Sequence, residues 1–182
     1  MLDGAVAARI LLLAAALAGS TAPAPAQSSP PEVAPGYRGF TPGMTYREFA
    51  ERARQLQRRQ ALVCNTSRRT ANLMECGARI LDPTDSASFY LGAFVLEGRV
   101  ALLSFGDSGD VALIERRQRE LTDHYGTPRA TGYGTWEWRF GRQIVRLNWR
   151  GRGERRWLYV AMWDSDILDG IGRYAKPSTG KQ

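Results

Sequence analysis

The segment Thr135–Trp163, TWEWRFGRQIVRLNWRGRGERRWLYVAMW, contains all five tryptophans of this 182-residue chain and predicts three consecutive β-strands. Aromatic and apolar residues occupy alternate positions along each strand, which is typical of an antiparallel sheet with one buried face. Each buried ring removes roughly 150–250 Å² from water, so we expect this sheet to supply much of the core. The alternation also favours burial of Trp149 and Trp157.

Two amphipathic helices are predicted upstream of this sheet. The first starts at Thr45, which forms a capping box with Glu48, and it should end near Gln60. The second starts after Asp110, a capping residue, and ends at Gly126, because glycine is favoured just beyond a helix C-terminus.

Two β-hairpins are predicted between the helices. They pair Ala61–Ser67 with Leu73–Ile80, and Phe89–Leu96 with Arg99–Phe105. The predicted fold class is therefore α+β, with two helices packed on antiparallel β-sheet. Because the order of helix and then strands occurs twice, a tandem helix-plus-sheet repeat stays open.

The beginning of the chain predicts export. Residues 1–26 read as a signal peptide, because Arg9 precedes the apolar run Ile10–Ala18 and small residues follow at the cleavage site. The run is shorter than the about 20 residues that cross a bilayer, so no transmembrane segment is predicted. We expect a periplasmic or secreted protein. The rest divides into a Pro/Ser-rich linker at 27–39, one domain at 40–171 with halves of about 40–106 and 107–171, and a flexible tail at 172–182.

The chain has two cysteines, Cys64 and Cys76, which lie opposite each other in the first predicted hairpin. An isolated pair in an exported protein predicts a disulfide. Closing so short a loop should stabilise the fold by roughly 3 kcal/mol.

The formal net charge of +7 favours acidic protein surfaces, anionic surfaces or nucleic acid as partners. The basic residues are almost all arginines, and several lie at the tips of predicted hairpins. The candidate binding residues are Arg68, Arg69, Arg150, Arg152, Arg155 and Arg156. The alternative interpretation is a pair of solvated turns without a specific partner.

A small basic hydrolase acting on a polyanion such as RNA is the catalytic alternative. In it Glu137 is the base, His124 the acid and Arg139 the phosphate ligand. The simpler interpretation places all three on solvated surfaces. A cleft that joins His124, Glu137 and an arginine would favour the hydrolase, whereas an exposed aromatic patch away from His124 would favour a binding module.

No cofactor and no metal is predicted. The chain lacks a zinc motif, a phosphate-binding glycine loop and a dinucleotide fingerprint. Asp164, Asp166 and Asp169 could collect a divalent cation, but a helix cap followed by Ile167 and Leu168 is the simpler interpretation.

Two short motifs suggest a family. Gly43-Met44-Thr45, followed by an amphipathic helix and antiparallel strands, resembles the start of the BamE/SmpA-like unit of bacterial envelope proteins. Tyr125-Gly126-Thr127-Pro128, followed by Trp136-Glu137-Trp138, resembles the helix end and first strand of the same unit. Two such units in tandem resemble the architecture of β-lactamase inhibitor proteins.

The resemblance implies a fold used for non-catalytic protein contacts, and it assigns no functional residues. From it and from the residues we expect an exported interaction module of the bacterial cell envelope that binds an envelope protein. The contact would use the sheet or the arginine-bearing hairpin tips. A purely structural envelope protein also stays open.

Overall fold

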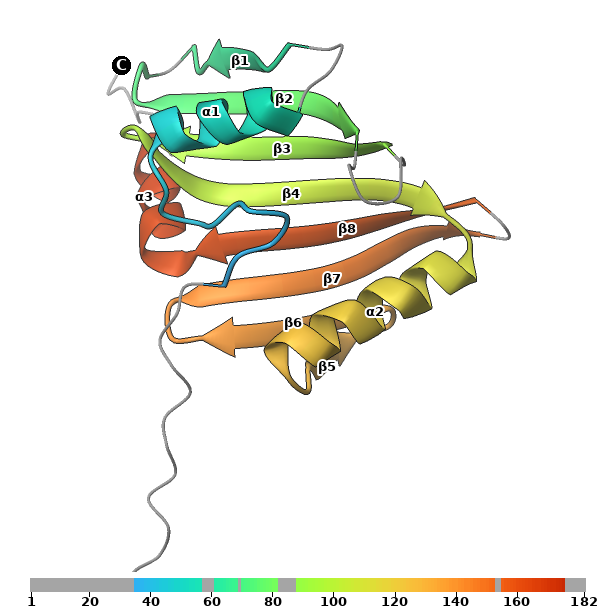
Figure 1. Cartoon of the computed structure of the whole chain (residues 1–182). Coiled ribbons are helices and arrows are strands. Elements are labelled where there is room, and N and C mark those ends of the chain that lie inside the picture. The colour runs from blue at the N-terminus through green and yellow to red at the C-terminus, as the bar shows by residue number, and fades with distance from the viewer. Residues whose placement is uncertain (1–34, 57–60, 69, 82–87, 153–154, 176–182) are drawn as a thin grey trace, which may run out of the picture. The chain divides into compact units, whose positions relative to one another are not determined.

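The computed structural model describes residues 35–56, 61–68, 70–81, 88–152 and 155–175. Its main element is one eight-stranded antiparallel sheet with the order β1-β2-β3-β4-β8-β7-β6-β5 (Figure 1). In chain order the strands are β1 (Val63–Thr66), β2 (Leu73–Leu81), β3 (Ser88–Leu96), β4 (Arg99–Gly109), β5 (Arg129–Gly132), β6 (Thr135–Phe140), β7 (Gln143–Arg152) and β8 (Arg155–Asp164).

Three helices accompany the sheet: α1 (Tyr46–Leu56), α2 (Val111–Tyr125) and α3 (Ser165–Ala175). The helices α1 and α2 lie on the same face of the sheet, in front of it in Figure 1. We call this side the helix face. The helix α3 contacts β3, β4 and β8 at the end of the sheet where β8 finishes. No helix in the described ranges is both long and apolar enough to cross a membrane.

The predicted fold class, two helices on an antiparallel sheet, is wrong. Strands dominate the described chain, and the helices are three short ones. The two hairpins and the tryptophan strands also form a single sheet, because β4 pairs with β8 from Leu102↔Trp163 to Gly109↔Arg156.

The helix cap favoured for Asp164 over a cation site is confirmed, because α3 follows it, whereas β5 was not predicted; both elements depend on tertiary contacts. The helix α3 contains Gly170 and Gly172, each of which lowers helix propensity by about 1 kcal/mol. Its N-terminus is capped by Asp164, whose Oδ1 accepts bonds from the backbone N–H groups of Asp166 (3.0 Å) and Ile167 (3.3 Å). The four residues of β5 are all exposed and lack apolar alternation, so this strand exists through its pairing with β6.

The start signals of both predicted helices are confirmed. The Thr45 N–H donates to Glu48 Oε2 (2.7 Å), and the Glu48 N–H donates to Thr45 Oγ1 (3.2 Å). At α2, Asp110 Oδ1 accepts from the Leu113 N–H (3.0 Å), and Gly126 ends the helix with φ 84°. The predicted end of the first helix near Gln60 lies outside the described residues.

The predicted disulfide is also confirmed. Cys64 and Cys76 are direct register partners on β1 and β2, and their sulfurs are bonded at 2.09 Å.

The core lies between the helix face and the helices α1 and α2. Phe105 on β4 is 1% exposed and packs against Tyr37 and Phe40, with ring centroids 5.0 and 5.9 Å away. On β8 the buried residues of the helix face are Leu158, Val160 and Met162. The alternate residues of β8 therefore point to the opposite face. The predicted burial of Trp157 is wrong, because this side chain is 54% exposed.

Candidate functional site

The face of the sheet opposite α1 and α2 carries three exposed aromatic residues, Tyr90, Trp157 and Tyr159, which we call the aromatic platform. Their exposed fractions are 55%, 54% and 37%. The register brings them together from distant parts of the chain, because Gly106 on β4 lies opposite both Tyr90 on β3 and Tyr159 on β8. Trp157 precedes Tyr159 by two residues on β8, so both side chains lie on the same face of the sheet, and Trp157 lies opposite Ser108.

Glycines on the neighbouring strands allow these rings to lie close to the backbone. A Cβ atom at Gly77 would overlap the Tyr90 hydroxyl, and one at Gly106 would lie 3.7 Å from both the Tyr159 ring and the Cβ atom of Tyr90. Glycine inside a strand often marks such a close approach, at a cost in strand stability. The platform is therefore a low aromatic surface supported by small residues.

Arginines and serines border the platform. Arg79 lies opposite Tyr90 in the register, and its Nε donates to Ser88 Oγ (3.1 Å). Arg150 lies opposite Trp157. A shallow cavity of about 280 Å³ between Tyr90 and Trp157 is lined by Arg79, Ser88, Phe89, Tyr90, Gly106, Ser108 and Trp157.

A second feature, on the helix face, is the tight turn Tyr37–Phe40. Its ends exchange two backbone hydrogen bonds, Tyr37 N–H to Phe40 O (2.9 Å) and Phe40 N–H to Tyr37 O (3.0 Å). Arg38 and Gly39 at its centre have φ values of 53° and 80°, the pattern of a type I′ turn. Positive φ is uncommon for a non-glycine residue, so the turn holds Arg38 in a costly conformation.

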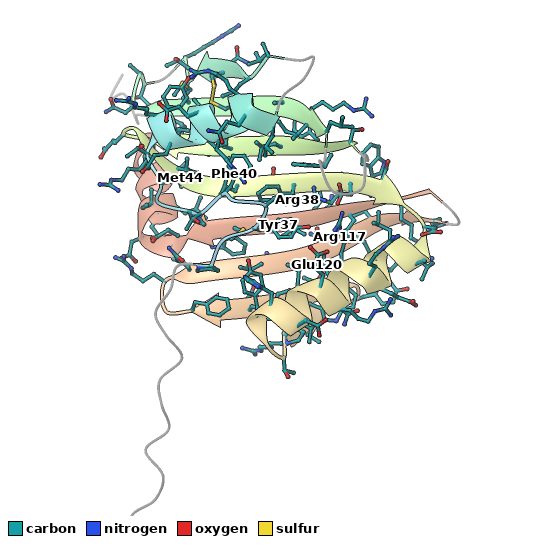
Figure 2. All side chains as sticks on the ribbon, in the orientation of Figure 1. Tyr37, Arg38, Phe40, Met44, Arg117 and Glu120 are labelled. Atoms are coloured by element: carbon teal, nitrogen blue, oxygen red, sulfur yellow. A yellow bond between two sulfur atoms is a disulfide. The ribbon has the colours of Figure 1, made fainter. Side chains whose placement is uncertain are left out.

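The turn carries Arg38 into the space between α1 and α2, where Figure 2 shows it near Tyr37 and Arg117. The Arg38 guanidinium carbon lies 3.9 Å from the centroid of the Phe89 ring. Its Nη2 pairs with Asp107 Oδ2 at 3.4 Å, and Arg117 Nε reaches the same oxygen at 3.5 Å. A buried carboxylate is thus shared by two guanidinium groups.

Ionisation in this cluster follows from burial and charge. Burial acts to lower the pKa of Arg117, but the carboxylates of Glu120 and Asp107, and Tyr37 once it ionises at high pH, outweigh it, so the pKa is raised. Arg117 Nη1 and Glu120 Oε2 lie 2.7 Å apart. Burial raises the pKa of Tyr37 to about 12, although Arg38 and Arg117 oppose the shift. The Tyr37 hydroxyl is therefore neutral at physiological pH.

The residues of the catalytic alternative do not converge. Glu137 and Arg139 lie together, with Arg139 Nε 2.7 Å from Glu137 Oε1. His124 lies on α2, and its ring is 4.6 Å from that of Tyr125. Trp138 bonds to the carbonyl of Gly126 at the end of α2, so Trp138 points to the helix face and Glu137 points away from it. The sheet therefore separates Glu137 from His124.

Glu137 is held by two arginines on the platform side of the sheet. Arg146 donates to its Oε2 from Nη2 (2.7 Å) and from Nε (3.1 Å). Burial acts to raise the pKa of Glu137, but the bonds from Arg146 and the charge of Arg139 hold it below its usual value. At neutral pH Glu137 is an ionised partner in this ion-pair network.

The candidate binding arginines fall at opposite ends of the sheet. Arg68 is exposed in the β1–β2 turn, near the end where β2 begins, and Arg69 lies outside the described residues. Arg150 and Arg152 are exposed at the other end, where β7 finishes. The remaining two lie on β8: Arg155 pairs with Arg152 in the register, and the Arg156 guanidinium lies 4.4 Å from the centroid of the Trp149 ring.

Several residues of the aromatic platform and of the Tyr37–Phe40 turn carry little signal in the sequence. Tyr90 and Tyr159 resemble ordinary strand residues in the sequence, although the glycines inside two neighbouring strands, Gly77 and Gly106, are a usable signal of a close approach. Tyr37 and Arg38 fall in the segment assigned to the linker, yet Tyr37 is only 6% exposed. Arg117 lies on α2 and carried no local signal, because its partners come from other parts of the chain.

Comparison with known proteins gives no match: no family model matches this chain, and neither does any curated protein or solved structure.

Proposed function

We propose that this chain is a non-catalytic protein-interaction module of the bacterial cell envelope, and that the aromatic platform contacts its partner. The observation that carries the proposal is the exposure of Tyr90, Trp157 and Tyr159 on the sheet face opposite α1 and α2. Tyrosine and tryptophan are enriched at the centres of protein interfaces, where they bury large areas with little loss of rotamer entropy. The platform also lies away from His124.

The partner surface is acidic. Arg79 is the direct register partner of Tyr90 on the neighbouring strand, and Arg150 is that of Trp157. The whole chain carries a net charge of +7. Carboxylates on a partner would pair with these arginines around an apolar centre, and such charge complementarity raises the association rate.

The envelope location rests on the cysteine pair and the leader. The disulfide between Cys64 and Cys76 persists in an oxidising compartment and is rare in the cytosol. Residues 1–26 have the pattern of a secretory signal peptide. Both support an exported module.

Site-specific photocrosslinking in living cells tests the proposal. A benzophenone amino acid replaces Trp157 in one variant and Tyr133 in a matched control. Tyr133 is 92% exposed but lies near the β5–β6 turn, away from the platform. We expect one dominant protein adduct from position 157 and none from position 133. Equal adducts at both positions, or none at position 157, would contradict the proposal.

Binding of the purified partner then tests the surface quantitatively. We expect Trp157→Ser or Tyr90→Ser to raise Kd at least tenfold, because a buried aromatic anchor is worth more than about 1.4 kcal/mol. Tyr133→Ser should leave Kd unchanged. Arg79→Gln with Arg150→Gln should weaken binding at low salt and flatten its salt dependence.

The hydrolase alternative gains no support from a specific observation. Its acid, His124, and its base, Glu137, lie on opposite sides of the sheet, and Glu137 is paired with Arg139 and Arg146. Proton transfer would need both groups within hydrogen-bond reach of one substrate.

A further inference from the structure

We propose that the cavity between α1 and α2 binds a small organic carboxylate with an apolar body. The cavity has a volume of about 740 Å³. This volume falls within the roughly 300–1,000 Å³ typical of small-molecule sites. Its lining residues are Gly36, Tyr37, Arg38, Gly39, Arg52, Leu56, Phe89, Arg117, Glu120, Leu121, Asp123 and His124.

The Tyr37 hydroxyl is the first polar group of the lining that lacks a hydrogen-bond partner among the described residues. Tyr37 is 6% exposed, and its hydroxyl has no hydrogen-bond partner among the described residues. Buried polar groups in native proteins are nearly always paired. Its raised pKa of about 12 keeps the hydroxyl protonated, so it is available as a donor to a carboxylate oxygen.

Arg52 is the second such group. Its Nε is buried without a hydrogen-bond partner in the described part of the chain, and its Nη1 donates only a long bond of 3.4 Å to the neutral amide of Gln55. The guanidinium lies against the Tyr37–Phe40 turn, since a Cβ at Gly39 would lie 2.5 Å from Arg52 Nη2. A guanidinium in this setting suits a carboxylate, which accepts two parallel bonds from it.

The ion pairs around the cavity involve two of its three arginines. Arg38 and Arg117 share Asp107, and Arg117 also pairs with Glu120. Arg52 forms no ion pair with a carboxylate of the described residues, so its guanidinium is the one that an added anion would pair with. The other titratable groups of the lining, Asp123 and His124, are exposed to solvent.

The apolar residues of the lining are the reason why we propose a carboxylate with an apolar body. Leu56 of α1 is partly exposed and contributes apolar surface, whereas Phe89 of β3 and Leu121 of α2 are only 2% and 1% exposed. A purely inorganic anion would leave this surface unused. A carboxylate on an apolar chain satisfies both the polar groups and the apolar walls.

The test is an NMR titration of the full, oxidised chain with 4-phenylbutyrate, and with 4-phenylbutan-1-ol as the uncharged counterpart. We expect the carboxylate to shift the backbone amides of residues 37–39 and of Arg52, with a Kd below about 1 mM. The alcohol should bind at least tenfold more weakly. Equal affinity for the two probes, or shifts confined to the aromatic platform, would overturn the proposal.

Two variants and a control locate the polar contacts. Arg52→Gln should weaken carboxylate binding at least tenfold and leave alcohol binding unchanged. Tyr37→Phe keeps the packed ring and removes only the hydroxyl, so it should weaken carboxylate binding severalfold in a folded protein. Arg47→Gln on α1 is the matched control, because this side chain is 87% exposed. If Arg47→Gln weakened binding as much as Arg52→Gln, the proposed site would be refuted.

Discussion

Gly39 has a backbone conformation and a neighbour that together favour glycine. Its φ is 80°, in the left-handed region that L-residues rarely adopt, and the Arg52 guanidinium occupies the space where a Cβ would lie. Gly98 shares the first property, with a φ of 77°, but no atom lies within 4 Å of its Cβ position. A comparison of substitutions at Gly39 and Gly98 therefore distinguishes the effect of backbone strain from the effect of side-chain crowding.

We expect Gly39→Ala and Gly98→Ala to lower the free energy of unfolding by similar amounts, about 1–2 kcal/mol each. The Arg52 guanidinium is the end of a flexible side chain, so it can move aside from the new methyl group at little cost. Denaturant unfolding measures the stabilities, and the Nε–H resonance of Arg52 reports its displacement. That resonance should shift only in Gly39→Ala. A shift of the same size in Gly98→Ala would contradict this account.

The role of Glu137 also belongs to the residue scale. Alternation along the strand correctly placed it on the face opposite Trp136 and Trp138, but only the register brought Arg146 directly across from it on β7. A candidate base became the centre of an ion-pair network because its partners are distant in sequence.

At the scale of elements, β1 is the least supported strand of the sheet. It has four residues, it lies at the edge of the sheet, β2 is its one partner among the described strands, and Val63 is 59% exposed. An edge strand of this length has few backbone bonds and little buried surface. The disulfide from Cys64 to Cys76 joins β1 covalently to β2, so we expect it to hold this edge strand in the sheet.

Removing the disulfide with Cys64→Ser and Cys76→Ser should lower the free energy of unfolding by roughly 3 kcal/mol, because the unfolded chain gains conformational entropy. Amide exchange should accelerate first in β1, while the amides of β3 and β4 should exchange only through global unfolding. Hydrogen exchange followed by NMR distinguishes the two regimes. Unchanged protection of β1 in the double variant would show that strand pairing alone holds it.

At the scale of the whole molecule, the pairing of β4 with β8 joins two four-stranded parts of the sheet. The first part contains β1 to β4, and the second contains β5 to β8. The buried core is continuous across this junction, since Leu103 and Phe105 of β4 belong to the same cluster as Val160 and Met162 of β8. The buried residues of both parts therefore belong to one core.

We therefore expect one cooperative unfolding transition. All five tryptophans lie between Trp136 and Trp163, so tryptophan fluorescence reports only on the second part. Amide exchange in β2 and β3 reports on the first part. The free energies from the two probes should agree within about 0.5 kcal/mol, an ordinary error for denaturant extrapolation. Two clearly different values would show that the parts unfold separately.

Local signals determined several features of this protein from sequence alone. The capping groups Thr45, Glu48 and Asp110, the glycine that ends α2 and the Cys64–Cys76 pair lie close to the groups they bond or the turns they end. Strand alternation likewise separated the residues of β8 into two faces. These features follow from backbone geometry over a few residues, so a sequence pattern is sufficient to predict them.

Only the tertiary structure decided which face of each strand is buried. Trp138 and Trp157 both alternate with smaller residues, yet Trp138 is 3% exposed and Trp157 is 54% exposed. Alternation divides a strand into two faces but does not say which one the helices will cover. The pairing of β4 with β8, the Tyr37–Phe40 turn and the glycines beneath Tyr90 were hidden for the same reason. They join residues far apart in the chain, and their energies come from contacts that exist only after the sheet has assembled.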